Sequence, residues 1–368
     1  MNIKKRINDN IKKLNRECGQ YKNSSVVIFG TASCGNMAYE TFKSSGEKIE
    51  AFIDNNQEKN NRIIADNIKC YLPEKFISEA AEPFIYIIAA GNHLYDILKK
   101  QVKDLLEKYN KKGAVFTFNE YVISQNFDRI KNVYKYLSDE KSKQTYEQII
   151  LARLLNCTDG FKDIFEPVQY FCLPEFSQSG MADEIFADCG AYVGDTLEKY
   201  LFYCGYLFKK IYAFEPVEQA FQALSTRAAR LKKEWGLKDD QIECINKGVG
   251  DIDKKLYLAE GTIDIGGSLI KESYSDGNSE CEVCSVDKTI DGKIDFIKAD
   301  IEGYELKMLK GAEKHIKTYK PKIAVCIYHS PSDLFTIAEY IKKLVPEYKM
   351  KLRHHSTCFY ESVLYCYI

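Results

Sequence analysis

Three stretches of the sequence carry residues that could do chemistry directly after an apolar run. In "EIFADCGAYVGDT", Asp188 leads into a turn that holds two glycines, and "IDFIKADIEGYE" ends in three acidic residues. The run "AVCIYHS" reaches His329 near its end. A glycine turn between a strand and a helix presents backbone N–H groups to a ligand, and a carboxylate beside a histidine suits proton transfer. These residue types predict a ligand site with acid–base chemistry.

The elements that would position these residues alternate between strand and helix patterns from Glu184 to the end. The predicted strands are "IFADCG", "IYAFEP", "ECINKGVG", "IDFIKAD", "KIAVCIYH", "KMKLRHH" and "SVLYCYI". The last two are too close for a crossover helix, so we expect them to be antiparallel. A parallel sheet that ends in an antiparallel pair is typical of S-adenosylmethionine-dependent methyltransferases, whereas a nicotinamide dehydrogenase would continue with another parallel strand.

A second alternating pattern precedes this one. Its strands are "SSVVIFG", "KIEAFIDNN", "PFIYIIAAGNH" and "AVFTF", and a short basic helix with Ile3, Ile7, Ile11 and Leu14 on one face comes before them. Alternation of this kind predicts a doubly wound α/β sheet. We therefore expect a Rossmann-like domain over residues 1–120, a helical connector over 121–180, and a second Rossmann-like domain over 181–368.

The bulk composition excludes several classes of protein. The 368 residues carry a net charge of −1, which gives no general attraction to nucleic acid. No apolar run is long enough for a membrane span, and the basic start lacks the apolar core of a signal peptide. The 13 cysteines are scattered, which favours a reducing cytoplasm. The pair in "CEVC" lacks partner ligands, so no metal is predicted. The sequence leaves the oligomeric state open, a homo-oligomer included.

The C-terminal motifs resemble those of the FkbM-type methyltransferases. The resemblance rests on "FADCGAYVGDT", "IYAFEP", "IDFIKADIEGYELKMLKGA" and the final "CIYHSPSDLFTIAEYI…YKMKLRHHS…ESVLYCYI". It extends over roughly the last 240 residues, and "ADIEGYE" followed by "LKGA" is its most specific part. The resemblance implies an enzyme that uses S-adenosylmethionine to methylate a hydroxyl of a sugar, a glycan precursor or a related metabolite.

The resemblance also implies where the cofactor would bind. The glycine turn would face the methionine carboxylate, Glu215 would accept hydrogen bonds from the ribose hydroxyls, and Lys247 and Gly248 would lie near the adenine. Ser268 could reach the ribose or the adenine. The predicted cofactor-binding residues are Asp188, Gly190, Ala191, Tyr192, Gly194, Asp195, Thr196, Glu215, Pro216, Lys247, Gly248, Ser268 and Asp300.

Asp300 and His329 are the predicted catalytic residues, because both end strands at the edge where α/β sheets bind ligands. Either could remove the proton of an acceptor hydroxyl. Glu302, His329, Arg353 and His354 are predicted to bind the acceptor. The alternatives are a helix-capping role for Glu302 and Glu305, and a solvated turn for Arg353 and His354. Asp300, Glu302 and His329 could together hold a divalent ion such as magnesium, but the sequence does not predict a metal site.

The first domain has a glycine turn of its own, in "IFGTASCG". Its spacing departs from the dinucleotide pattern and is similar to that of the N-terminal domains of sugar acyltransferases, which implies a nucleotide-linked sugar as ligand. Gly30, Gly35, Asp54 and Asn92 would then form the site. The alternative is a domain used for packing or dimerisation.

Two other functions compete with methyl transfer. One is an NAD-dependent oxidoreductase that uses the first domain, and the antiparallel final strands and "ADIEGYE" count against it. The other is a nucleotide-sugar-binding protein whose methyltransferase fold is not catalytic. The presence of Gly190, Gly194, Glu215 and Asp300 together counts against that function.

Overall fold

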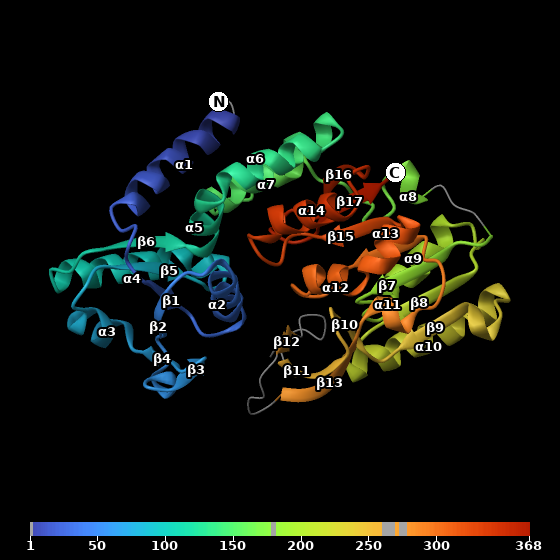
Figure 1. The fold of residues 1–368 in the computed structure, drawn as a ribbon, viewed down its shortest axis with the longest axis horizontal. Helices are drawn as coiled ribbons and strands as arrows, with labels where there is room; N and C mark the ends of the chain where they lie inside the picture. The colour runs from blue at the N-terminus through green and yellow to red at the C-terminus, as the bar shows by residue number, and fades with distance from the viewer. Residues whose placement is uncertain (1–2, 178–181, 260–268, 272–277) are drawn as a thin grey trace. The chain divides into compact units, whose positions relative to one another are not determined.

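The computed structural model describes residues 3–177, 182–259, 269–271 and 278–368. Contacts divide the chain into two compact units, Met1–Lys131 with Glu147–Gly160, and Asn132–Tyr146 with Phe161–Ile368. Helices α6 (Phe127–Tyr136) and α7 (Glu140–Leu155) contribute residues to both units (Figure 1). The segment expected to be a helical connector is therefore divided between the units.

The first unit contains a six-stranded sheet in the order β3-β4-β2-β1-β5-β6. The strands are β1 (Val26–Phe29), β2 (Ile49–Ile53), β3 (Ile63–Ala65), β4 (Ile68–Tyr71), β5 (Phe84–Ile88) and β6 (Gly113–Thr117). All pairs are parallel except β3 with β4. The four predicted strands are confirmed, while the short β3 and β4 were not predicted.

Helices connect the strands of the first unit. They are α1 (Ile3–Gly19), α2 (Ser33–Ser45), α3 (Pro73–Glu79), α4 (Tyr95–Lys108) and α5 (Phe118–Gln125). Helix α1 buries Ile7, Ile11 and Leu14, as its spacing predicted. Helix α2 ends at Gly46, whose left-handed conformation lets its N–H bond the last carbonyls of the helix.

The second unit contains a seven-stranded sheet in the order β16-β17-β15-β14-β7-β8-β9. The strands are β7 (Ile185–Cys189), β8 (Lys210–Phe214), β9 (Ile242–Ile245), β14 (Phe296–Ala299), β15 (Lys322–Cys326), β16 (Lys349–His354) and β17 (Ser362–Tyr367). Strand β17 is antiparallel to both neighbours, and the other pairs are parallel. The predicted sheet with an antiparallel end is confirmed.

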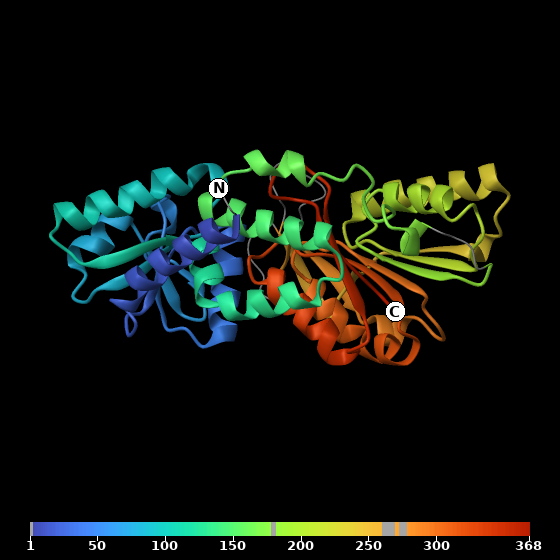
Figure 2. The same ribbon diagram turned by 90° about the horizontal axis from the view of Figure 1, so that it is seen from above.

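Helices cover both faces of this sheet. They are α8 (Pro174–Ser177), α9 (Asp195–Tyr203), α10 (Glu218–Trp235), α11 (Val286–Thr289), α12 (Glu305–Gly311), α13 (Glu313–Tyr319) and α14 (Asp333–Leu344). In Figure 2, α10 and the orange helices α12–α14 lie on opposite sides of the strands. The chain leaves β7 towards β8 on one side, while β14 pairs with β7 on the other. This reversal of direction is a topological switch point at the carboxyl ends of β7 and β14, the kind of place where α/β proteins bind ligands.

A smaller sheet in the order β10-β13-β11-β12 forms the predicted insert. Its strands are β10 (Gly248–Val249), β11 (Lys254–Ala259), β12 (Leu269–Lys271) and β13 (Asn278–Cys284). The prediction of one strand over "ECINKGVG" was wrong, because β9 belongs to the large sheet and β10 pairs with β13. Gly311, the glycine of "LKGA", lies against this insert, since a Cβ there would be 1.9 Å from the carbonyl oxygen of Gly250.

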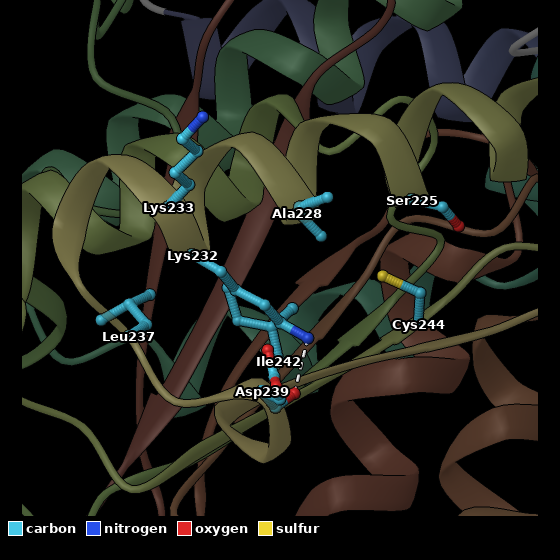
Figure 3. A pocket seen from close by; sticks show the side chains of 9 residues that line it. Ser225, Ala228, Lys232, Lys233, Leu237, Asp239, Ile242 and Cys244 are labelled. Atoms are coloured by element: carbon cyan, nitrogen blue, oxygen red, sulfur yellow. Dashed lines mark hydrogen bonds between the residues drawn. The ribbon is translucent and has the colours of Figure 1, made fainter.

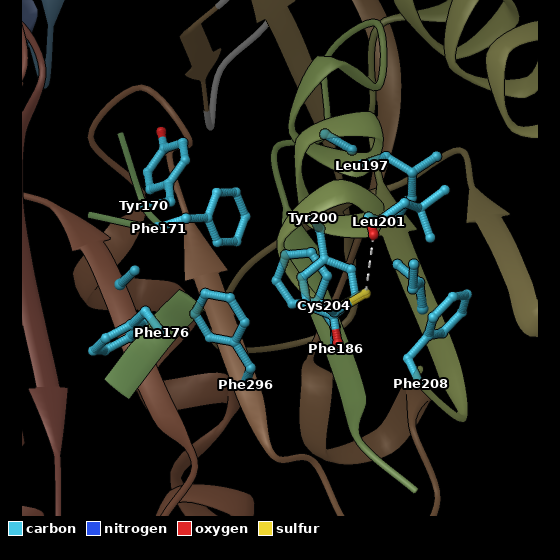
Figure 4. Close-up of a cluster of buried hydrophobic side chains, with 14 of the residues drawn as sticks. Tyr170, Phe171, Phe176, Phe186, Leu197, Tyr200, Leu201, Cys204, Phe208 and Phe296 are labelled. Atoms are coloured by element: carbon cyan, nitrogen blue, oxygen red, sulfur yellow. Dashed lines mark hydrogen bonds between the residues drawn. The ribbon is translucent and has the colours of Figure 1, made fainter. Parts of the chain in front are cut away.

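The core of the second unit is rich in aromatic side chains. Phe186 of β7 stacks on Phe296 of β14 with ring centroids 4.6 Å apart, and Phe176 packs edge-on against Phe296 (Figure 4). Tyr170 and Phe171, which precede α8, belong to the same cluster. This packing brings the segment before β7 against the sheet.

In the described part of the chain, no helix is long and apolar enough to cross a membrane.

Candidate active site at the carboxyl ends of β7 and β14

The glycine turn after β7 is folded tightly against β14 and β8. Gly190 has a φ of 83°, and a Cβ there would lie 2.0 Å from the carbonyl oxygen of Asp300. The N–H groups of Gly190 and Ala191 both donate to the carbonyl of Phe214, and that of Gly194 donates to Ala191. Several N–H groups that we expected to face a ligand are therefore used to hold the turn itself.

Glu215, at the end of β8, is bonded to the same turn. Its Oε2 accepts from the N–H of Tyr192 and its Oε1 from that of Val217, each at 2.9 Å. The side chain is 5% exposed, and burial raises its pKa. A carboxylate oxygen has two lone pairs, so each oxygen can still accept one further hydrogen bond. The carboxylate can thus hold the turn and bind a ribose hydroxyl together, next to Pro216.

A buried ion pair lies beneath the turn. Lys298 Nζ is 3.1 Å from Asp188 Oδ1 and donates to the carbonyl of Gly190 at 2.7 Å. Burial alone would lower the pKa of Lys298, but the charges of Asp188 and Asp300 outweigh it and raise that pKa. Asp188 is fully buried, and burial raises its pKa even though Lys298 acts in the opposite direction. The structure thus gives Asp188 a partner within the protein.

The other predicted cofactor residues have different surroundings. Thr196 is buried at the start of α9, and Asp195 pairs with Lys199 at 2.9 Å. Lys247 pairs with Glu282 of β13 at 2.9 Å. Gly248 begins β10 and is not part of a free turn at the end of the large sheet, which corrects its predicted position. Ser268 lies outside the described residues.

Asp300 follows β14 and is held by two tyrosines. Tyr170 donates to Oδ2 at 2.8 Å, and Tyr328 donates to Oδ1 at 3.0 Å. Burial acts to raise the pKa of Asp300, yet the charges of His329 and Lys298 bring it below the usual value. The side chain keeps 21% of its surface exposed, so an acceptor could reach it.

His329 follows β15 and lies beside Asp300, as the strand ends predicted. Its Nε2 is 3.5 Å from Asp300 Oδ1 and 3.6 Å from Glu302 Oε2, while its Nδ1 is 3.0 Å from Glu305 Oε1. Burial alone would lower the pKa of His329, but these three carboxylates raise it to about 10. An imidazolium cannot take a proton, so the geometry does not fit the predicted role of His329 as a general base near neutrality.

The two glutamates of "IEGYE" differ in their surroundings. Burial, together with the charge of Asp300, raises the pKa of Glu302 to about 7. Glu305 begins α12, is 1% exposed, and accepts from the N–H of Ile301 at 2.9 Å. Its Oε2 has no hydrogen-bond partner in the described structure. Glu305 thus stands in the first turn of α12, but its hydrogen bond goes to Ile301 before the helix, so it does not cap the helix, and one oxygen of its carboxylate is left over.

Comparison with known proteins agrees with this architecture. The family model of the methyltransferase FkbM domain matches residues 188–352, which include the glycine turn, Glu215, Asp300 and His329. The chain thus contains a methyltransferase FkbM domain over residues 188–352. The strand order, with β17 antiparallel between β15 and β16, is the sheet expected for such a domain. No curated protein sequence matches the chain.

Two solved methyltransferase structures are similar to this chain to different extents. A methyltransferase FkbM from Methylobacillus flagellatus KT is 21% identical, with a TM-score of 0.56, and the match covers 97% of this chain and 93% of that one. An rRNA methylase from Streptococcus thermophilus is 18% identical, with a TM-score of 0.33, over 52% of this chain and 89% of that one. The first match shows that the fold likeness extends over both units.

The structure places Arg353 and His354 differently from our prediction. Both lie inside β16 and not in the turn after it. Arg353 Nη2 forms an ion pair with Asp139 Oδ2 at 2.7 Å. The His354 side chain is completely buried, and its ring is hydrogen-bonded to the hydroxyl of Ser362. The predicted acceptor-binding role of these two residues does not fit, because neither side chain is available to a ligand.

The glycine turn of the first unit is closed by its own side chains. Thr31 donates to Asp54 Oδ2 through its N–H at 3.1 Å and its hydroxyl at 2.6 Å, and Lys59 donates to the Thr31 hydroxyl at 2.6 Å. Gly35 is buried in α2, and a Cβ at Gly30 would be 2.3 Å from the carbonyl of Ala89. Asn92 accepts through its carbonyl from Asn156. Asp54 thus has a partner where we expected a ligand.

Sequence reasoning assigned no site role to three residues of the candidate site. Tyr170 and Tyr328 bind Asp300, and Lys298 connects β14 to the glycine turn. Lys298 and Tyr328 stand next to predicted residues at strand ends, which was an available signal. Tyr170 lies 130 positions before Asp300, in a segment without a motif, so no local pattern identified it.

A cavity of about 470 Å³ lies away from these residues, between α10 and β9. Figure 3 shows Ser225, Ala228, Lys232, Cys244 and others around it, with Lys232 donating to the carbonyl of Asp239 at 2.6 Å. None of the predicted site residues lines it, so we do not place the reaction there.

Proposed function

We propose that S-adenosylmethionine binds at the carboxyl ends of β7 and β8 and methylates the hydroxyl of a sugar or related metabolite. The observation that carries the proposal is Glu215, which follows β8 and is hydrogen-bonded to Tyr192 of the glycine turn after the neighbouring strand β7. A carboxylate at the end of the second strand is suited to the ribose hydroxyls of an adenosine.

The acceptor would approach Asp300. Bound S-adenosylmethionine would supply an electrophilic methyl group to the acceptor oxygen, and the hydroxyl proton would pass to the Asp300 carboxylate, so that S-adenosylhomocysteine and a methyl ether would result. The sulfonium is already a strong electrophile, so the protein mainly places the two reactants in line and excludes water. The Asp300 carboxylate, fixed by Tyr170 and Tyr328, would accept the hydrogen bond of the acceptor hydroxyl.

Binding of S-adenosylhomocysteine tests the cofactor part of the proposal. We expect isothermal titration to give one site per chain, and Glu215→Ala to weaken binding by about 1–3 kcal/mol, because ribose hydroxyls lose a charged partner. Glu218→Ala is the matched control, since that exposed carboxylate pairs with Asn246 and Gln222 and not with the turn. Equal affinity in all three proteins would remove Glu215 from the site.

The rival functions enter the same test as competing ligands. A thermal-shift series with S-adenosylmethionine, NAD and UDP-sugars compares them, because a ligand stabilises the folded state it binds. Stabilisation by NAD alone would favour an oxidoreductase. A nucleotide-linked sugar at the first unit stays a prediction, and the bonds between Asp54 and Thr31 do not favour it.

A further inference from the structure

We propose that Asp300, Glu305 and His329 form a binding site for a divalent cation. Each of the three offers one ligand atom, and these atoms all lie within 4.8 Å of one another. The residues come from the end of β14, the start of α12 and the end of β15, so three elements fix their positions. The cation would bind beside the place where the acceptor hydroxyl is expected.

Unused polar atoms are the first argument for a ligand here. The Glu305 side chain is 1% exposed and the His329 side chain is 6% exposed. Glu305 Oε2 and both ring nitrogens of His329 lack a hydrogen bond of good geometry in the described structure, although His329 lies 3.0 Å from Glu305. Buried polar atoms normally have partners, because an unsatisfied one costs about 1–3 kcal/mol.

Charge is the second argument. Asp300, Glu302 and Glu305 all face the ring of His329 at 3.0–3.6 Å. The carboxylates of Asp300 and Glu305 alone carry more negative charge than a single imidazolium can balance, and buried charges need compensation. Lys298 is already engaged with Asp188 and Gly190. A divalent cation would supply this compensating positive charge in place of the imidazolium proton, which would be released when a ring nitrogen of His329 binds the cation.

The donor set indicates which cations fit. Carboxylates bind magnesium and manganese, whereas imidazole is a better ligand for zinc, iron and other first-row metals. A mixed set of two carboxylates and one histidine therefore favours Mn²⁺ or Zn²⁺ over Mg²⁺.

A bound cation could also hold the acceptor oxygen and lower the pKa of its hydroxyl. That use of the cation rests on the proposed function, whereas cation binding itself does not.

Manganese binding to the full chain tests the site directly. After treatment with a chelator, titration with Mn²⁺ followed by electron paramagnetic resonance should show one bound ion per chain, and Zn²⁺ should displace it. Glu305→Gln and His329→Gln should each weaken Mn²⁺ binding at least tenfold. Asp300→Asn should do the same.

His315→Gln is the matched control. His315 is also buried and also lies beside a carboxylate, with Nδ1 2.6 Å from Asp287 Oδ1, but it is not part of the three-residue group. This variant should bind Mn²⁺ like the wild type. Circular dichroism identifies any variant that does not fold, and the isosteric Glu305→Gln keeps the test decisive if His329→Gln fails.

Two results would overturn the site. One is a wild-type protein that takes up neither Mn²⁺ nor Zn²⁺, and the other is unchanged affinity in folded Glu305→Gln and Asp300→Asn. Titration with S-adenosylhomocysteine on the same samples separates this proposal from the preceding one. Cation uptake without cofactor binding would leave the cation site standing and contradict the methyl-donor proposal.

Discussion

Removing the Lys298 charge should destabilise the second unit strongly. Lys298 is 3% exposed and Asp188 is fully buried, so Lys298→Met would leave a carboxylate without its countercharge. Breaking a buried pair from one side usually costs about 3–5 kcal/mol. The variant also loses the hydrogen bond to the Gly190 carbonyl, which is worth roughly 1 kcal/mol. We therefore expect a loss of about 4–6 kcal/mol in unfolding free energy.

The double variant Asp188→Asn/Lys298→Met should recover most of this loss, because it buries two neutral groups of similar shape. We expect the double variant to be only about 1–2 kcal/mol less stable than the wild type, since a pair replaced as a whole leaves no orphaned charge. Asp188→Asn completes the cycle and should cost about 1–2 kcal/mol, because Lys298 keeps its hydrogen bond to the Gly190 carbonyl and its attraction to the charge of Asp300. The coupling between the two sites should then exceed about 2 kcal/mol.

Urea unfolding followed by tryptophan fluorescence is the suitable assay. The chain has a single tryptophan, Trp235, which ends α10 in the second unit and stacks on Tyr206 at 3.8 Å. Its signal therefore reports this unit even if the two units unfold separately. Additive costs in the double variant would refute the reasoning, because they would mean that Asp188 does not depend on Lys298 for its charge.

Two further predictions concern pH and the glycine turn. Burial lowers the pKa of His355 from 6.5 to about 4, so its contribution to stability is complete above pH 6.5 and falls as the pH drops towards 4. In urea titrations, the free energy of unfolding of His355→Gln should therefore vary with pH less than that of the wild type, by up to about 3 kcal/mol. Parallel curves for the two proteins would contradict this. Gly190→Ala should weaken S-adenosylhomocysteine binding at least tenfold, because the new Cβ would clash with the carbonyl oxygen of Asp300. Gly205→Ala is the control and should bind normally, because Gly205 also has a positive φ but has open space around it. Equal affinity of both variants in calorimetry would show that the turn is not part of the site.

Much of the fold could be predicted from local sequence. Apolar runs of four to seven residues between helical patterns identified six of the seven strands of the large sheet correctly, and the short turn before "SVLYCYI" identified its antiparallel end. The seventh, "ECINKGVG", was only partly right, because its second half pairs with the insert. No local pattern shows which neighbour a two-residue strand will choose.

The sequence by itself determined the α/β class, the glycine turn and the arrival of Asp300 and His329 at strand ends, because these follow from hydrophobic periodicity and from residue types. Only the tertiary structure decided which partners these residues have. Arg353 turned out to be buried against Asp139, and Tyr170 reached Asp300 from a distant segment. Such contacts depend on how the strands are ordered and how the segments pack, and hydrogen bonds between residues far apart in the chain leave no trace in the local pattern.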